Sequence, residues 1–365
     1  MFWKTTKLDL ICYPPMPDHV ARPWDAADEY ILERANPEEK TLIFNDRFGA
    51  LAVNYPEAKL WLESACARIA AEKNLGRNEI ASQPDRWITH IEPDTRQILI
   101  KAPKDFEQLQ FWLHLIQTDC PDARILIAGM SKHIPISWLT WLEAHCAGYT
   151  QHPIQRKARL VEVGGPNIPD KCIQLDGYHW EELELLATPG VFGRHHIDIG
   201  SRFLLETLTE QQLSFSGRLC DLGCGNGLLG FTLKHRHPDL ELVMTDDSFQ
   251  AVESARENSK RNHLDATIVH GDTLLNTPGQ FDIIVCNPPF HDGHRQLTNF
   301  AQRMFEQSAR QLTSGGQLLV VANRHLPYSA LLKQQYRRVQ VVKQNPKFIV
   351  FQCSLAKHTK ENTLA

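Results

Sequence analysis

The 365-residue sequence lacks several features that mark specialised protein classes. No apolar run approaches the roughly 20 residues that cross a bilayer, so no membrane span is expected. Nine cysteines are scattered without a CxxC pair, which argues against a zinc site or a disulfide framework and predicts reduced thiols. The N-terminus has no apolar segment followed by a small-residue cleavage site. We therefore expect a cytoplasmic protein without a bound metal.

An excess of basic charge is also missing, since 39 Lys and Arg stand against 43 Asp and Glu, for a net charge of −4. A protein that wraps nucleic acid without sequence preference is usually basic. If the partner is RNA, the contact must therefore be a local patch. The candidate basic clusters are Arg156-Lys157-Arg159, Lys260-Arg261, His291 with His294 and Arg295, and Arg337-Arg338.

What is present is the composition of a globular protein, with 42% hydrophobic and 22% charged residues. The length predicts two domains, and the segment Val163–Pro169, rich in Gly and Pro, predicts a connector between them. The predicted division is a first domain at 1–162, a linker at 163–175, a catalytic domain at 176–356 and a tail at 357–365.

The second half alternates short apolar runs with amphipathic stretches, which predicts a parallel sheet with ligands at the carboxyl ends of its strands. The predicted strands are 218–222, 240–245, 266–270, 281–286 and 317–322, with a final pair near 339–342 and 348–353. Predicted helices between the first five include 248–262 and 297–312.

The first half repeats this plan in an eroded form. Four segments carry the likeness: 25–32 reads like 198–205, 45–51 falls at the cofactor loop, 98–104 falls at the strand before Asn287, and 125–129 reads like 318–322. The first copy has one glycine where the second has three. We infer a duplicated domain whose first copy has lost the cofactor and catalysis and now helps to recognise substrate.

The segment Asp221–Gly227 is the first of two chemical motifs. Gly223, Gly225 and Gly227 follow a predicted strand, where side chains would obstruct a cofactor and the required backbone angles. Residues 225–230 also satisfy the G-x-G-x-x-G pattern, and Asp246 follows about 20 residues later. A dinucleotide cofactor, NAD(P), is therefore a rival interpretation.

Two acidic residues favour S-adenosylmethionine over a dinucleotide. Asp221 precedes the first glycine, where it would repel a pyrophosphate but suits a cationic sulfonium and ammonium. Asp272 follows the third predicted strand, a suitable place to accept a hydrogen bond from the adenine amine. Asp246 would then bind the ribose, although an Asp at a strand end also commonly forms a turn or a helix cap.

The second motif, Asn287-Pro288-Pro289-Phe290, follows a continuous apolar run typical of a buried parallel strand. Two prolines stiffen the turn and leave carbonyl oxygens as acceptors. The oxygens of Asn287 and Pro288 could both accept from one NH₂ group, and Phe290 offers a ring for stacking on a base. Such a site orients a planar amine that is flipped out or already unpaired. Cys286 is expected to be a buried strand residue, and His291 and His294 lack further metal ligands.

These motifs together resemble the bacterial RsmC/RlmG group of ribosomal RNA guanine-N2 methyltransferases, over nearly the whole chain. In the second half the likeness rests on Pro189–Phe192, Asp198–Gly200, Asp221–Gly227, Asn287–His291 and Val321–Leu326. In the first half, Trp24–Tyr30, Asn45–Leu51 and Ile100–Lys104 resemble the large-subunit branch of the group. The segment Phe192-Gly193-Arg194 departs slightly, because Ser often follows that Phe in the family.

The resemblance implies two tandem class I, Rossmann-like methyltransferase domains of α/β class, the N-terminal one degenerate. It implies S-adenosylmethionine as donor and a guanosine of 23S ribosomal RNA as acceptor. Asp221, Gly223, Gly225 and Gly227 would line the methionine and ribose, Asp246 the ribose hydroxyls and Asp272 the adenine. Asn287 and Pro288 would hold the amine, Pro289 would stiffen the turn, and Phe290 would stack on the base.

Three alternatives stay open from the residues alone. The chain could be an NAD(P)-dependent oxidoreductase, or a ribosome-assembly factor that kept the fold without turnover. The same chemistry could also act on 16S ribosomal RNA or on another planar amine, because Asn-Pro-Pro-aromatic turns also serve adenine-N6 and protein glutamine methylation.

Overall fold

A computed structural model describes residues 2–3, 6–17, 21–81, 84–213, 215–289 and 294–355. The chain divides into two compact units, Met1–Gln174 and Leu175–Ala365. Residues 163–166, which the sequence prediction assigned to the linker, complete a strand of the first unit, β8 (Ala158–Pro166). The predicted tail lies outside the described residues.

The second unit contains a seven-stranded sheet in the order β13-β12-β11-β14-β15-β17-β16. Its strands are β11 (Arg218–Leu222), β12 (Glu241–Asp246), β13 (Thr267–His270), β14 (Phe281–Cys286), β15 (Leu312–Asn323), β16 (Arg338–Gln344) and β17 (Phe348–Ser354). The first five pair in parallel, and β17 enters antiparallel between β15 and β16. The predicted strands are confirmed, except that β15 begins earlier because Leu312 pairs with Phe281.

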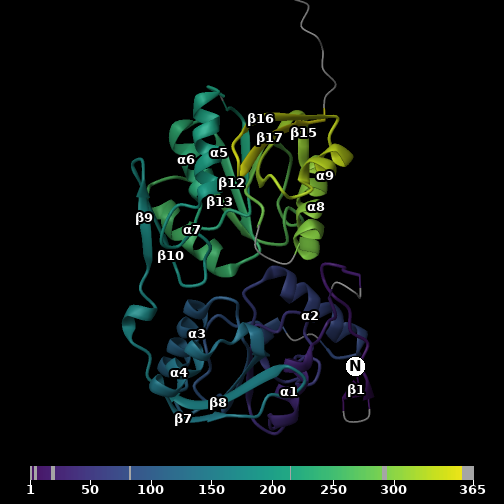
Figure 1. Ribbon diagram of the computed structural model, residues 1–365, viewed down its shortest axis with the longest axis vertical. Helices are drawn as coiled ribbons and strands as arrows, with labels where there is room; N and C mark the ends of the chain where they lie inside the picture. The colour runs from purple at the N-terminus through teal and green to yellow at the C-terminus, as the bar shows by residue number, and fades with distance from the viewer. Residues whose placement is uncertain are drawn as a thin grey trace, which may run out of the picture. The chain divides into compact units, whose positions relative to one another are not determined.

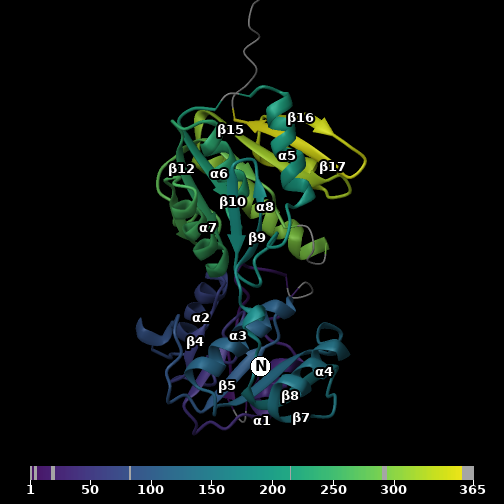
Figure 2. The same ribbon diagram turned by 90° about the vertical axis from the view of Figure 1, so that its left-hand side faces the viewer.

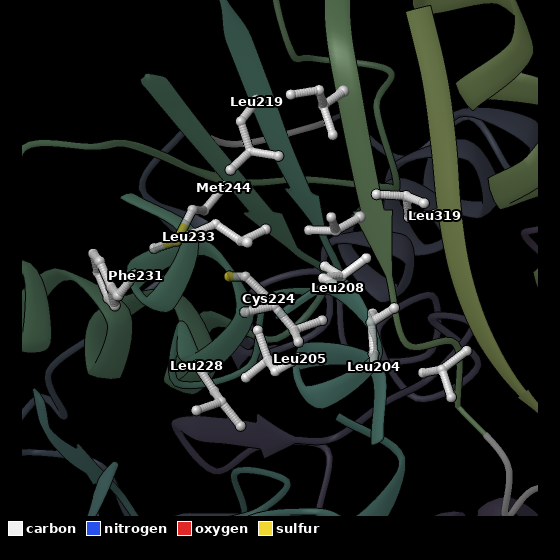
Figure 3. Packing of buried hydrophobic residues seen from close by; sticks show 14 of the residues in the cluster. Leu204, Leu205, Leu208, Leu219, Cys224, Leu228, Phe231, Leu233, Met244 and Leu319 are labelled. Carbon is white, nitrogen blue, oxygen red and sulfur yellow. The ribbon is translucent and has the colours of Figure 1, made fainter. Parts of the chain in front are cut away.

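Helices cover both faces of this sheet, as expected when parallel strands are buried on two sides (Figure 1). One face carries α5 (Ile199–Glu210), α6 (Leu228–Arg236) and α7 (Phe249–Arg261), and the other carries α8 (His294–Gln311) and α9 (Tyr328–Gln335). Figure 3 shows leucines of α5 and α6 packed with Met244 of β12 and Leu319 of β15. A hairpin that the sequence did not predict, β9 (Asp176–Trp180) and β10 (Leu183–Ala187), lies beside α7 (Figure 2).

The first unit repeats this topology with six strands in the order β4-β3-β5-β6-β8-β7. They are β3 (Thr41–Phe44), β4 (Lys59–Trp61), β5 (Gln97–Lys101), β6 (Arg124–Met130), β7 (Cys146–Gln151) and β8. Its helices are α1 (Ala26–Arg34) and α2 (Ala65–Arg77) on one face and α3 (Phe106–Asp119) and α4 (Ile136–His145) on the other. The strand that would correspond to β13 is reduced to one parallel bridge, between Leu60 of β4 and Trp87. The predicted duplication is confirmed.

The remaining short elements are β1 (Phe2–Trp3), β2 (Thr6–Lys7) and 3₁₀ turns at Pro84–Arg86, Ser131–His133 and Asp170–Cys172. Every cysteine except Cys172 is buried. Among the described helices, none combines the length and apolarity needed to cross a membrane.

Candidate functional site

The carboxyl ends of β11 and β14 bring the two predicted motifs together. These strands are parallel neighbours, and their paired residues Leu222 and Cys286 are the last in each strand. The next residues, Gly223 and Asn287, therefore begin adjacent loops at one edge of the sheet. This is where parallel α/β sheets place ligands.

The glycine loop holds an unusual backbone that leaves space beside it. Gly223, Gly225 and Gly227 have φ values of 77°, 55° and 92°. A Cβ on Gly225 would meet only the Phe192 carbonyl oxygen, at 3.8 Å, whereas one on Gly227 would collide with the Phe231 ring at 2.3 Å. Gly225 thus keeps room for a ligand, and Gly227 allows α6 to pack closely.

Asp221 is fully buried under this loop. Its Oδ2 accepts from the Gly230 backbone N–H at 2.8 Å, and its buried Oδ1 has no hydrogen-bond partner among the described residues. Burial raises the pKa of Asp221 to about 7. A cation placed at Oδ1 would satisfy that oxygen and favour the ionised form.

Asp246 ties the loop to the next helix. Its Oδ2 accepts from the Gly225 N–H at 2.9 Å and its Oδ1 from the Ser248 N–H at 2.8 Å. Burial within this turn raises the pKa of Asp246 to about 6. Of the two structural roles considered for this residue, the turn is observed and the helix cap is not, because Ser248 is the N-cap of α7. Each oxygen of Asp246 keeps a second lone pair for a ligand hydroxyl.

Asp272, the third predicted cofactor residue, is fully buried and forms an ion pair with Arg303 of α8. This partner could not be predicted from the sequence, because Arg303 lies 31 residues away on an otherwise ordinary amphipathic helix. The contact with adenine stays a prediction.

The amide of Asn287 is fixed by α5. Its Nδ2 donates to Asp198 Oδ2 at 2.9 Å and to Ser201 Oγ at 2.8 Å. Its Oδ1 is buried and has no hydrogen-bond partner among the described residues. Pro288 is buried and Pro289 is exposed. Phe290 and His291 lie outside the described residues, as do the side chains of His294 and Arg295.

Two asparagines that the sequence analysis overlooked, one in α7 and one at its C-cap, hold β10, and the first of them also holds the glycine loop. Asn258 Nδ2 donates to the carbonyls of Asn226 and Leu186, at 2.9 and 2.8 Å, and its Oδ1 accepts from the Leu186 N–H. One turn later, Asn262 brackets Glu184 in the same way. Asparagine is a poor helix former, so two of them four residues apart were a usable signal.

In two of the predicted basic clusters, an arginine forms ion pairs with nearby glutamates. Arg156 pairs with Glu29 and Glu33, and Arg261 pairs with Glu184 and Glu257. Their charges are partly balanced on the surface. Among the described residues there is no group of His, Cys, Asp and Glu that could hold a metal ion.

Comparisons with known proteins cover both units. Residues 2–167 match the RLMG N-terminal domain, and residues 182–352 match the methyltransferase small domain. The ribosomal RNA large subunit methyltransferase G of Stutzerimonas stutzeri (strain A1501) is 36% identical over 94% of this chain and 96% of its own. The protein of that name from Klebsiella pneumoniae (strain 342) is 33% identical over 94% of each chain.

A solved structure shares the two-unit architecture. The T. thermophilus 16S rRNA N2 methyltransferase RsmC, in complex with AdoMet and guanosine, aligns with a TM-score of 0.75 over 90% of this chain and 92% of that one. At 21% identity this likeness shows the fold. Full-length identity above 30% to the large-subunit enzymes settles the family: the chain belongs to the ribosomal RNA large subunit methyltransferase G family.

Proposed function

We propose that this protein transfers a methyl group from S-adenosylmethionine to the exocyclic N2 amine of a guanosine in 23S ribosomal RNA, in the cytoplasm. One observation carries the proposal: the Asn287 amide is held with both N–H groups occupied and its oxygen without a partner among the described residues, beside the glycine loop. The large-subunit methyltransferases among its relatives support ribosomal RNA as the substrate.

The chain's residues fit this cofactor. Asp221 Oδ1 is a buried acceptor suited to the ammonium group, and Gly223 and Gly225 leave the loop surface open. Asp246 can accept from the ribose hydroxyls with its remaining lone pairs, and Asp272 is assigned to the adenine edge. When bound, the cofactor supplies an electrophilic methyl group on a cationic sulfur.

Asn287 and Pro288 act on the acceptor. A base amine is a weak nucleophile because its lone pair is delocalised into the ring. Oxygens of the Asn287 side chain and the Pro288 backbone would accept its two hydrogens, which orients the nitrogen and favours tetrahedral character. Phe290 would hold the base by stacking, an interaction worth about 1–3 kcal/mol. Catalysis then comes from positioning and electrostatics.

The test is methylation of RNA from a strain that lacks the enzyme, with labelled cofactor and nucleoside analysis. We expect label in N2-methylguanosine of 23S RNA, and a loss of about 100-fold or more in kcat for Asn287→Ala. Asn287→Ala should still bind S-adenosylhomocysteine, because the cofactor residues are intact. Label in 16S RNA or in another nucleoside would redirect the substrate assignment, and full activity in Asn287→Ala would remove the proposed catalytic role.

We also infer that the first unit serves RNA recognition. It retains the fold, but the positions of Asp221 and Asp246 are taken by buried Ile43 and Leu62. The first unit therefore lacks two of the carboxylates proposed to bind the cofactor. Exposed Arg47 stands in its loop at the position of Gly225. Arg47→Glu should raise the KM for RNA and leave the affinity for S-adenosylhomocysteine unchanged.

A further inference from the structure

The first turn of α5 presents two acceptors to Asn287. Asp198 is the N-cap of this helix, and its Oδ2 accepts from the Ser201 N–H and from Asn287 Nδ2, both at 2.9 Å. Ser201 Oγ accepts the second Nδ2 hydrogen at 2.8 Å. The Asp198–Gly200 segment belongs to the family resemblance, but the sequence assigned it no role.

These contacts decide which way the amide points. An Asn side chain can turn by 180° and exchange its donors with its acceptor. A turned amide would set Asn287 Oδ1 against the Asp198 carboxylate, which only accepts, and would leave Asn287 Nδ2 in the buried place of Oδ1. An amide group in that position would present donors, not an acceptor, to the hydrogens of a target amine.

The first unit has the same arrangement of a strand end and a helix N-terminus, with a different side chain at the strand end. Lys101 follows Ile100, the partner of the last residue of β3, just as Asn287 follows Cys286, the partner of the last residue of β11. Lys101 Nζ lies 2.7 Å from Asp25 and 2.8 Å from Asp28, the N-cap and N3 residues of α1. In both units, therefore, the N-cap and N3 side chains accept from the residue at the end of the strand.

We propose that Asp198 and Ser201 are positioning residues that fix the Asn287 amide with its oxygen toward the target amine. The proposal rests on the function assigned to Asn287 above. Asp198 then has two roles. Many side chains could cap α5, but the orientation of the amide requires an acceptor at the Oδ2 position of Asp198.

Two substitutions of Asp198 distinguish these roles. Asp, Asn and Ser are comparable N-caps. In Asp198→Asn the amide oxygen can still accept from both Ser201 and Asn287, whereas the shorter side chain in Asp198→Ser caps the helix without reaching Asn287. We expect kcat to fall about 10-fold or more in Asp198→Ser and less than about 3-fold in Asp198→Asn, with similar melting temperatures. Ser201→Ala should lower kcat by about 3-fold.

The matched control is Asp25→Ser, which makes the same cap exchange in the first unit and should leave kcat unchanged. Equal kcat in Asp198→Asn and Asp198→Ser, or a loss confined to the affinity for S-adenosylhomocysteine, would overturn the positioning role. If these variants are equal while Asn287→Ala is inactive, only this inference fails. If Asn287→Ala is active, the proposed function of Asn287 fails first.

Discussion

The two units build the same sheet edge from different side chains, and the comparison separates scaffold from chemistry. Asn45 and Gly49 keep the left-handed backbone of Gly223 and Gly227, with φ values of 59° and 75°. Asn74 binds Phe48 and Ile11 as Asn258 binds Asn226 and Leu186. The backbone and its supports have survived in both units.

The differences that bear on chemistry lie at the residues that would meet a ligand. Ile43, Leu62, Arg47 and Lys101 stand at the positions of Asp221, Asp246, Gly225 and Asn287. Apolar side chains replace the carboxylates, and a cation held by two carboxylates replaces the amide. A fold can therefore keep its loops for stability after it has lost the groups that make them a site.

The largest effect is expected when a residue of the glycine loop is replaced by the residue at the matching position of the first unit. Gly225→Arg should weaken S-adenosylhomocysteine binding by about 100-fold or more, because the side chain fills the open space and disfavours the required φ. Gly223→Asn should weaken it less, since Asn45 adopts φ 59° at the matching place. Calorimetric titration would measure both, with one site per chain in the parent. Equal losses would break the parallel between the loops.

The next effect concerns stability. Lys101→Met should destabilise the first unit by about 3 kcal/mol, because Asp28 would be left as a buried carboxylate without its cation. Although burial opposes ionisation, Asp28 and Asp25 raise the pKa of Lys101 above its ordinary value. Asn287→Ala, which removes a neutral amide from the matching position, should cost less than Lys101→Met in a denaturant titration of the full chain. A larger cost for Asn287→Ala would contradict this reading.

Asn74 and Asn258 are the corresponding asparagines of the two units, and their substitutions should give similar losses of stability but different losses of function. Asn74→Ala and Asn258→Ala each remove the three side-chain hydrogen bonds of a fully buried asparagine and should destabilise by about 2–3 kcal/mol. Only Asn258→Ala should also weaken cofactor binding, since it frees Asn226 of the glycine loop. Thermal melts with and without S-adenosylhomocysteine would show a smaller ligand-induced shift for that variant alone.

The smallest effect is a pH dependence that distinguishes the units. Burial and repulsion from Asp28 raise the pKa of Asp46 to about 7. Between about pH 4 and 7 the folded state binds the extra proton, so stability falls as pH rises. Asp46→Asn keeps an acceptor for the Ala52 N–H and should raise the melting temperature by about 2–4 °C at pH 8, but not at pH 4.

Asp221, whose pKa is also raised to about 7, provides the comparison. Asp221→Asn should stabilise the cofactor-free protein at pH 8 in the same sense. The gain should vanish with S-adenosylhomocysteine, because its ammonium group stabilises the ionised Asp221. The gain in Asp46→Asn should not depend on the ligand. Melting curves of both variants at two pH values would decide this.

The sequence by itself determined the fold class, the strands of the second unit, the duplication and the meeting of the glycine loop with Asn287. These follow from local patterns, because apolar period, glycine and proline act over a few residues. The sequence could not determine which oxygens stay available. The orientation of the Asn287 amide depends on Asp198, 89 residues earlier, and the state of Asp272 depends on Arg303. Only the tertiary structure brings such groups together, because hydrogen bonds and burial are set by neighbours in space.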